Sequence, residues 1–394
     1  MIKKETNHDK IWDGSFTFVC WTYFVILLMF ISLRVVSGLG WLEGLDNRVV
    51  EIGFSFLSQI VIMAGVPLVA MYIYKKRKEG KTEYVSMEDA KPKTNLWVSF
   101  GFDKPSIGTI GFAFLLGFLI YFFNIFVASF FNGILGLFGF RFGGGIGDMS
   151  FTGIGGLFVM LTLIAVLPGI CEEVSHRGML LKSFSSRMGI MRAMLFSSIL
   201  FGFMHLNIVQ VFFAAVLGYI IALATVATKS LWVGIIMHFM NNALATYLSI
   251  ANRNGWFGGN LLQDMMSIFS GMGFILYIAF AIFLFWAIFQ IIHVLARRTY
   301  EKDKSQHLIT IIKQDPSVLT KPDGGVLTLD EFTATVDVAL PRLSKWQKTK
   351  FFVDPMTLFK KRPMNLTRHE RMIFYGILFM GGLITLFTMV WGFL

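Results

Sequence analysis

The stretch "LFVMLTLIAVLPGICEEVSHRGMLL", residues 157–181, contains two carboxylates, a histidine and an arginine in an otherwise apolar run. A run of about 20 or more mostly apolar residues is typical of a helix that spans a lipid bilayer. Ionisable side chains are costly in the hydrocarbon layer and usually have a functional reason to be there. The stretch therefore predicts a membrane helix with functional ionisable side chains.

The composition of the whole chain supports this interpretation. Of the 394 residues, 55% are hydrophobic and 15% are charged, and the mean hydropathy is +0.66. A soluble domain of this length is much less apolar. We predict an all-α polytopic membrane protein with eight or nine transmembrane helices: 16–39, 53–74, 107–131, 155–181, 208–228, 231–250, 268–295 and 372–393, with a shorter candidate at 193–206.

The basic residues predict the orientation of these helices. If the N-terminus is cytoplasmic, three of the 35 Lys and Arg residues fall in outer loops and two fall within spans, which leaves 30 on the inner side. This asymmetry agrees with the positive-inside rule. The net charge of +11 then reflects topology and attraction to anionic lipid, so no nucleic-acid partner is implied. We expect a multi-pass protein of the plasma membrane, and the short "MIKK" start favours a bacterial one.

Three polar motifs interrupt the central spans. The first is "EEVSHR" at 172–177, the second contains Phe201 and His205, and the third contains His238 and Asn242. In each motif the polar residues are spaced about one helical turn apart, so they can share a face. With about 1.5 Å of rise per residue, all three motifs lie at a similar depth in the cytoplasmic half of the bilayer. We therefore expect three neighbouring helices to bring these groups together.

Such a set of side chains can hydrolyse an amide. A carboxylate beside a histidine can take a proton from water, and a second histidine with an asparagine can donate hydrogen bonds to the oxyanion. Zinc binding by two histidines and a carboxylate is the alternative. A metal would require three separate helices to converge, because the sequence lacks a His-Glu-x-x-His pair on one helix.

Together the motifs resemble those of the CAAX-processing and bacteriocin-processing intramembrane proteases (CPBP, or Abi). The similarity consists of Glu-Glu-x-x-x-Arg at 172–177, Phe-x-x-x-His at 201–205 and His-x-x-x-Asn at 238–242, with "RGMLL" after the first and "SLWVGIIMH" before the third. The resemblance implies an all-helical catalytic core whose cavity opens toward the cytosol. It covers about residues 155–250.

The resemblance also implies roles for individual residues. Glu172 and His205 would activate water, while His238 and Asn242 would stabilise the oxyanion. We expect no cofactor, and the alternative is a zinc ion on Glu172, His205 and His238. Three supporting residues complete the site: Glu173 and Arg177 as an internal ion pair, and Phe201 as a packing residue.

We divide the chain into five parts. Residues 1–154 contain N-terminal transmembrane helices and a cytoplasmic linker, 155–250 the catalytic core, 251–296 a transmembrane helix, 297–370 a cytoplasmic module and 371–394 the last transmembrane helix. In the module, apolar positions alternate in "GGVLTLDEFTATVDVAL" after a "KPDGG" turn signal. We therefore expect a small α/β or β-containing module before the last helix, which could bind a protein partner.

The sequence thus predicts an intramembrane endopeptidase that cleaves a membrane-associated or lipidated peptide or protein. The alternative is a catalytically silent membrane scaffold, or a bacteriocin immunity protein, that retains the protease fold. A secondary transporter would also bury ionisable groups, but it should show repeated halves with paired broken helices. The sequence shows no such repeat.

Overall fold

The computed structural model describes residues 9–39, 44–80, 95–140, 151–272, 274–314, 319, 325–327 and 364–391. Within these ranges, eight helices are long and apolar enough to cross a membrane, and Ile190–Phe203 is a shorter apolar helix. The chain is a multi-pass membrane protein, and the predicted all-helical core is confirmed.

The elements run in chain order as follows: η1 (Asp9–Trp12), α1 (Phe16–Gly38), α2 (Asn47–Phe56), η2 (Leu57–Gly65), α3 (Val66–Gly80), α4 (Leu96–Phe100), α5 (Ile107–Leu137), α6 (Gly153–Met160), η4 (Leu161–Val166), α7 (Leu167–Glu173), η5 (Val174–Leu180), α8 (Leu181–Met188), α9 (Ile190–Phe203), α10 (Ile208–Thr228), α11 (Leu231–Asn254), α12 (Leu261–Met272), α13 (Phe274–Gln314) and α15 (Arg368–Trp391). Three of these, η2, η4 and η5, are π-helical turns inside longer helices. Turns of this kind are rare and often occur at functional sites.

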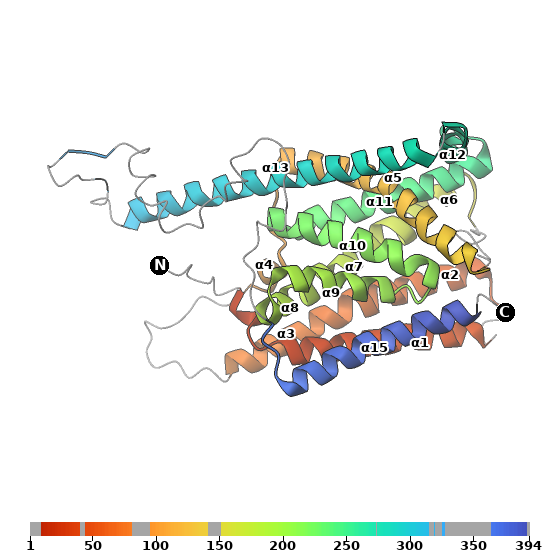
Figure 1. Ribbon diagram of the computed structural model, residues 1–394. Coiled ribbons are helices and arrows are strands. Elements are labelled where there is room, and N and C mark those ends of the chain that lie inside the picture. The colour runs from red at the N-terminus through yellow and green to blue at the C-terminus, as the bar shows by residue number, and fades with distance from the viewer. Residues whose placement is uncertain are drawn as a thin grey trace.

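The continuous helical stretch from α6 to α8 lies in the middle of the bundle (Figure 1). Its central element α7 packs against η2 and α11, and η5 contacts α9. The long helix α13 lies with α5 along one side, and α1 and α15 lie together on the opposite side. The elements that contain the three polar motifs are therefore enclosed by the other helices.

The expected β-containing module at 297–370 is not supported. Its first residues, 297–314, continue helix α13, and the described residues contain no strand. The reason lies in the sequence: no Gly or Pro interrupts the helix before Pro316, and a proline disfavours helical geometry at the residue before it. Most of the alternating stretch at 324–340 lies outside the described residues.

A close helix crossing holds α11 against α5. A Cβ atom on Gly117 would lie 2.5 Å from the Cβ of Met240 and 2.9 Å from the carbonyl oxygen of Met237. No side chain fits this position without displacing the backbone of α11. Small residues at such crossings let membrane helices approach closely.

We expect Gly117→Ala to destabilise the fold by about 1–3 kcal/mol, because the added methyl group overpacks the crossing. The measurement is thermal unfolding of the purified protein in detergent. Gly111→Ala is the matched control, since Gly111 is on the same helix and a Cβ atom there meets nothing within 4 Å. Equal unfolding temperatures for the two variants would show that the crossing tolerates the methyl group.

Candidate active site

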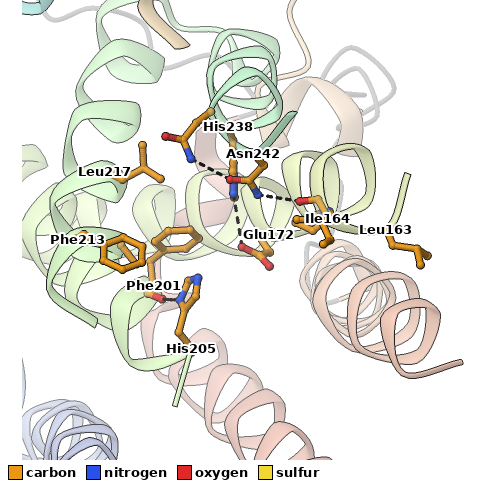
Figure 2. A pocket seen from close by; sticks show the side chains of 12 residues that line it. Leu163, Ile164, Glu172, Phe201, His205, Phe213, Leu217, His238 and Asn242 are labelled. Carbon is orange, nitrogen blue, oxygen red and sulfur yellow. Dashed lines mark hydrogen bonds and ion pairs between the residues drawn. The ribbon is translucent and has the colours of Figure 1, made fainter. Parts of the chain in front are cut away.

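The three polar motifs meet at one cavity of about 250 Å³ (Figure 2). All four residues predicted to act in catalysis line it, and so does Phe201. Glu172 comes from α7, His205 from the loop between α9 and α10, and His238 and Asn242 from α11. The remaining wall is mostly apolar and is formed by Leu163, Ile164, Pro168, Phe213, Ala214, Leu217 and Asn241.

Both oxygens of the Glu172 carboxylate have polar neighbours. Its Oε1 accepts a hydrogen bond from Nε2 of Gln59, at 2.9 Å. Its Oε2 lies 3.9 Å from Nε2 of His238. The side chain is 14% exposed, so the carboxylate is held in place yet open to the cavity.

His205 is oriented by the last turn of the preceding helix, α9. Its Nδ1 lies 3.0 Å from the carbonyl oxygen of Phe201. A carbonyl oxygen can only accept, so Nδ1 carries the hydrogen and Nε2 of the neutral ring has a free lone pair. Among the described contacts, no direct hydrogen bond joins His205 to Glu172. Both side chains line the same cavity, which has room for a small molecule such as water.

Helix α15 braces the loop that carries His205. The backbone N–H of Ile208 donates to Oγ1 of Thr388, at 3.1 Å. On the other side of the loop, the ring of Phe203 packs so closely on Gly381 that a Cβ atom there would lie 2.5 Å from it. The last transmembrane helix thus contributes to the geometry of the site.

A buried charge network lies behind the cavity wall. Nη1 of Arg177 donates to Oε1 of Glu173 at 2.8 Å, and both side chains are almost completely buried, at 1% and 0% exposed. The other end of the guanidinium donates to the carbonyl oxygen of Gly218, at 2.8 Å. Its carbon lies 4.6 Å from the centre of the Phe201 ring, a cation–π contact. One arginine therefore connects η5 with α9 and α10.

The same network orients His238. Oε1 of Glu173 lies 3.0 Å from Nδ1 of His238, on the side of the ring that faces away from Glu172. Hydrogen bonding of a histidine to a carboxylate through one nitrogen fixes the ring and determines what the other nitrogen can offer. When His238 is protonated, its charge and that of Arg177 balance the charges of Glu172 and Glu173. Nε2 of His238 then carries an N–H that points toward the cavity.

Asn242 is oriented by a feature of the neighbouring helix. Pro168 has no backbone N–H, so the carbonyl of Ile164, four residues earlier, has no partner from that position. Nδ2 of Asn242 donates to this carbonyl, at 2.9 Å. Asn241 in turn donates through its Nδ2 to Oδ1 of Asn242, at 2.9 Å. The oxygen of the Asn242 amide is therefore an acceptor, and its nitrogen is the end that donates to Ile164. The second N–H of Asn242 is then available to a ligand in the cavity.

The alternative prediction is a metal site on Glu172, His205 and His238. Across the described ranges, no group of three or more His, Cys, Asp or Glu side chains is placed to hold a metal ion. Glu172, His205 and His238 share the wall of the cavity.

Sequence reasoning missed one polar residue of the site, Gln59, which lies in the predicted span 53–74. The only signal was a single amide side chain in an apolar run. It also placed His176 on the face of Glu172, since the two are four residues apart. In the structure, His176 is not among the residues that line the cavity. Its Nδ1 lies 2.9 Å from the backbone oxygen of Glu172, and its ring is buried against Tyr23 and Phe201.

Comparison with known families finds a similarity that covers this site. Residues 154–244 match the family model described as type II CAAX prenyl endopeptidase Rce1-like. This segment contains all three motifs, so the predicted similarity to CAAX-processing proteases is confirmed for it. Neither the curated proteins nor the solved structures contain a match to the chain.

Proposed function

We propose that the protein is an intramembrane endopeptidase that hydrolyses a peptide bond in a membrane-associated or lipidated substrate. The observation that carries the proposal is the convergence of Glu172, His205, His238 and Asn242 on one cavity within the Rce1-like segment. A silent scaffold would not need these four side chains around an open space. We therefore favour an enzyme over a scaffold or an immunity protein.

In the proposed reaction, Glu172 accepts a proton from a water molecule that lies between it and His205. His205 accepts a hydrogen bond from this water through its free Nε2 and so orients it. The water oxygen attacks the carbonyl carbon of the substrate, and a tetrahedral oxyanion forms. Proton transfer from Glu172 to the amide nitrogen then allows the carbon–nitrogen bond to break.

The oxyanion needs hydrogen-bond donors on the opposite wall of the cavity. Nε2–H of protonated His238 and the second N–H of Asn242 are suited to this role, because Glu173 and Ile164 already fix their orientation. Donors that are oriented in advance stabilise a developing charge without reorganisation. No metal ion takes part in this proposal.

The membrane orientation that we propose has the N-terminus in the cytoplasm. The support is that the C-terminal ends of α3 and α8 and the start of α15, all with basic residues, lie at the same end of the bundle (Figure 1). Glu172 lies about ten residues, or roughly 15 Å, from the basic end of its helix. A cytoplasmic substrate segment could reach the cavity from this side.

The test is cleavage of a library of lipidated and membrane-anchored peptides by the purified protein in liposomes, with products identified by mass spectrometry. We expect defined cleavage sites, and the cleaved peptides would identify the substrate class. Absence of cleavage across lipidated and unlipidated peptides by a folded protein would contradict the proposal.

Metal removal provides a second prediction. We expect cleavage to be unchanged after dialysis against a strong chelator, because the proposed base and oxyanion donors are side chains of the protein. Activity should be measured before dialysis, after it and after zinc is added back. Activity that disappears on dialysis and returns with zinc would contradict the metal-free mechanism.

A further inference from the structure

The second membrane span brings an unexpected polar group to the site. Gln59 lies in the π-helical turn η2, whose neighbouring residues Ile60 and Val61 are 41% and 49% exposed on the outer surface of the bundle. Gln59 itself is 9% exposed and points inward with Ile62 and Met63. An amide buried in a membrane helix is costly unless it is hydrogen-bonded.

The partner of this amide is the proposed catalytic base. Nε2 of Gln59 lies 2.9 Å from Oε1 of Glu172, although the two residues are 113 positions apart in the sequence. An ionised carboxylate is only an acceptor, so Gln59 must be the donor. Gln59 also lies outside the Rce1-like segment, so the segment is completed by a residue from another part of the chain.

The contact restricts the rotation of the carboxylate. One oxygen is held by Gln59 from η2, and the other faces His238 from α11. These two neighbours approach from different helices, so the plane of the carboxylate is defined with respect to the cavity. Among the residues that the structure describes, the buried carbonyl oxygen of the Gln59 side chain has no hydrogen-bond partner, and the side chain bonds to Glu172 through its amide nitrogen.

We propose that Gln59 is a positioning residue for the reaction, one that holds Glu172 in the orientation needed to take a proton from water. The inference depends on the proposed function of Glu172. A small displacement of a base from its productive geometry can lower a rate by about 100-fold. We expect loss of this contact to lower kcat and to leave KM almost unchanged, because Gln59 does not line the cavity that would receive the substrate.

The experiment compares Gln59→Met, which keeps the length of the side chain and removes the donor, with Gln59→Glu, which keeps the shape and places a second carboxyl group against Glu172, so that the two groups compete for a proton. We expect each variant to lower kcat by about 10- to 100-fold, with KM within about twofold of the wild-type value. Met63→Leu is the matched control, because Met63 is buried on the same face of η2, and its kcat should be close to wild type.

Two further arms separate the inference from the proposed function. In a Glu172→Gln background, Gln59→Met should cause no further loss of activity. If Gln59 acts through Glu172, the effects of the two substitutions are not additive. Wild-type kcat in Gln59→Met, with activity lost in Glu172→Gln, would overturn the role of Gln59 alone. Retained activity in Glu172→Gln would overturn the proposed function itself. Loss of folded protein in both Gln59 variants would show a purely structural contact and also overturn the inference.

Discussion

Glu172→Gln is expected to lower peptide cleavage by about 10²- to 10⁴-fold, the usual contribution of a general base. The amide has the same size as the carboxylate but cannot take a proton from water. Its carbonyl oxygen can still accept the hydrogen bond from Gln59, so the cavity should keep its shape. The measurement is the initial rate on a cleaved peptide, with thermal unfolding measured beside it.

Two companion variants make this prediction sharper. His205→Ala removes the other group proposed to hold the water, and it should also reduce cleavage while leaving expression and membrane insertion intact. Glu51→Gln, an acid-to-amide change in α2 away from the cavity lining, is the control and should cleave at the wild-type rate. A folded Glu172→Gln protein with near-normal activity would contradict the proposed chemistry.

Arg177→Met is expected to destabilise the protein by about 3–5 kcal/mol, since it leaves the Glu173 carboxylate buried without its cation. The substitution also removes the hydrogen bond to Gly218 and the contact with Phe201. Both Glu173 and Phe201 touch His238, so the site should be disrupted as well. Unfolding in detergent and the yield of monodisperse protein provide the measurement.

The chain contains a matched control for this ion pair. Lys75 and Glu79 have the same i,i+4 spacing, but their charged atoms are 3.7 Å apart and their side chains are 17% and 34% exposed. Exposed pairs of this kind contribute about 0.5 kcal/mol or less. Lys75→Met should therefore unfold almost as the wild type does. If Arg177→Met unfolds at the same temperature as Lys75→Met, the buried network is not needed for stability.

Much of the architecture could be predicted from the sequence because a membrane imposes simple rules. A bilayer requires long apolar helices, so the spans could be located from hydropathy alone. The cost of ionisable groups in the same layer made the polar motifs conspicuous. Their one-turn spacing and similar depth were enough to predict which residues would meet.

Other features could not be predicted because they depend on contacts between distant segments or on backbone details. The alternating apolar residues at 324–340 suggested a β-containing module over 297–370. The first part of that range, 297–314, is instead the end of helix α13. The π-helical turn η5, which begins directly after Glu173, is likewise predicted by no local pattern in the sequence.

By itself, the sequence determined that this is a helical membrane protein with ionisable groups concentrated at one depth, because transfer into a bilayer is governed by local composition. Only the tertiary structure decided how each group is held: Glu172 by Gln59, His238 by Glu173, and Asn242 by the backbone carbonyl of Ile164. Hydrogen bonds of this kind join residues far apart in the chain and depend on distances of a few tenths of an ångström. Such distances are determined by the packing of whole helices.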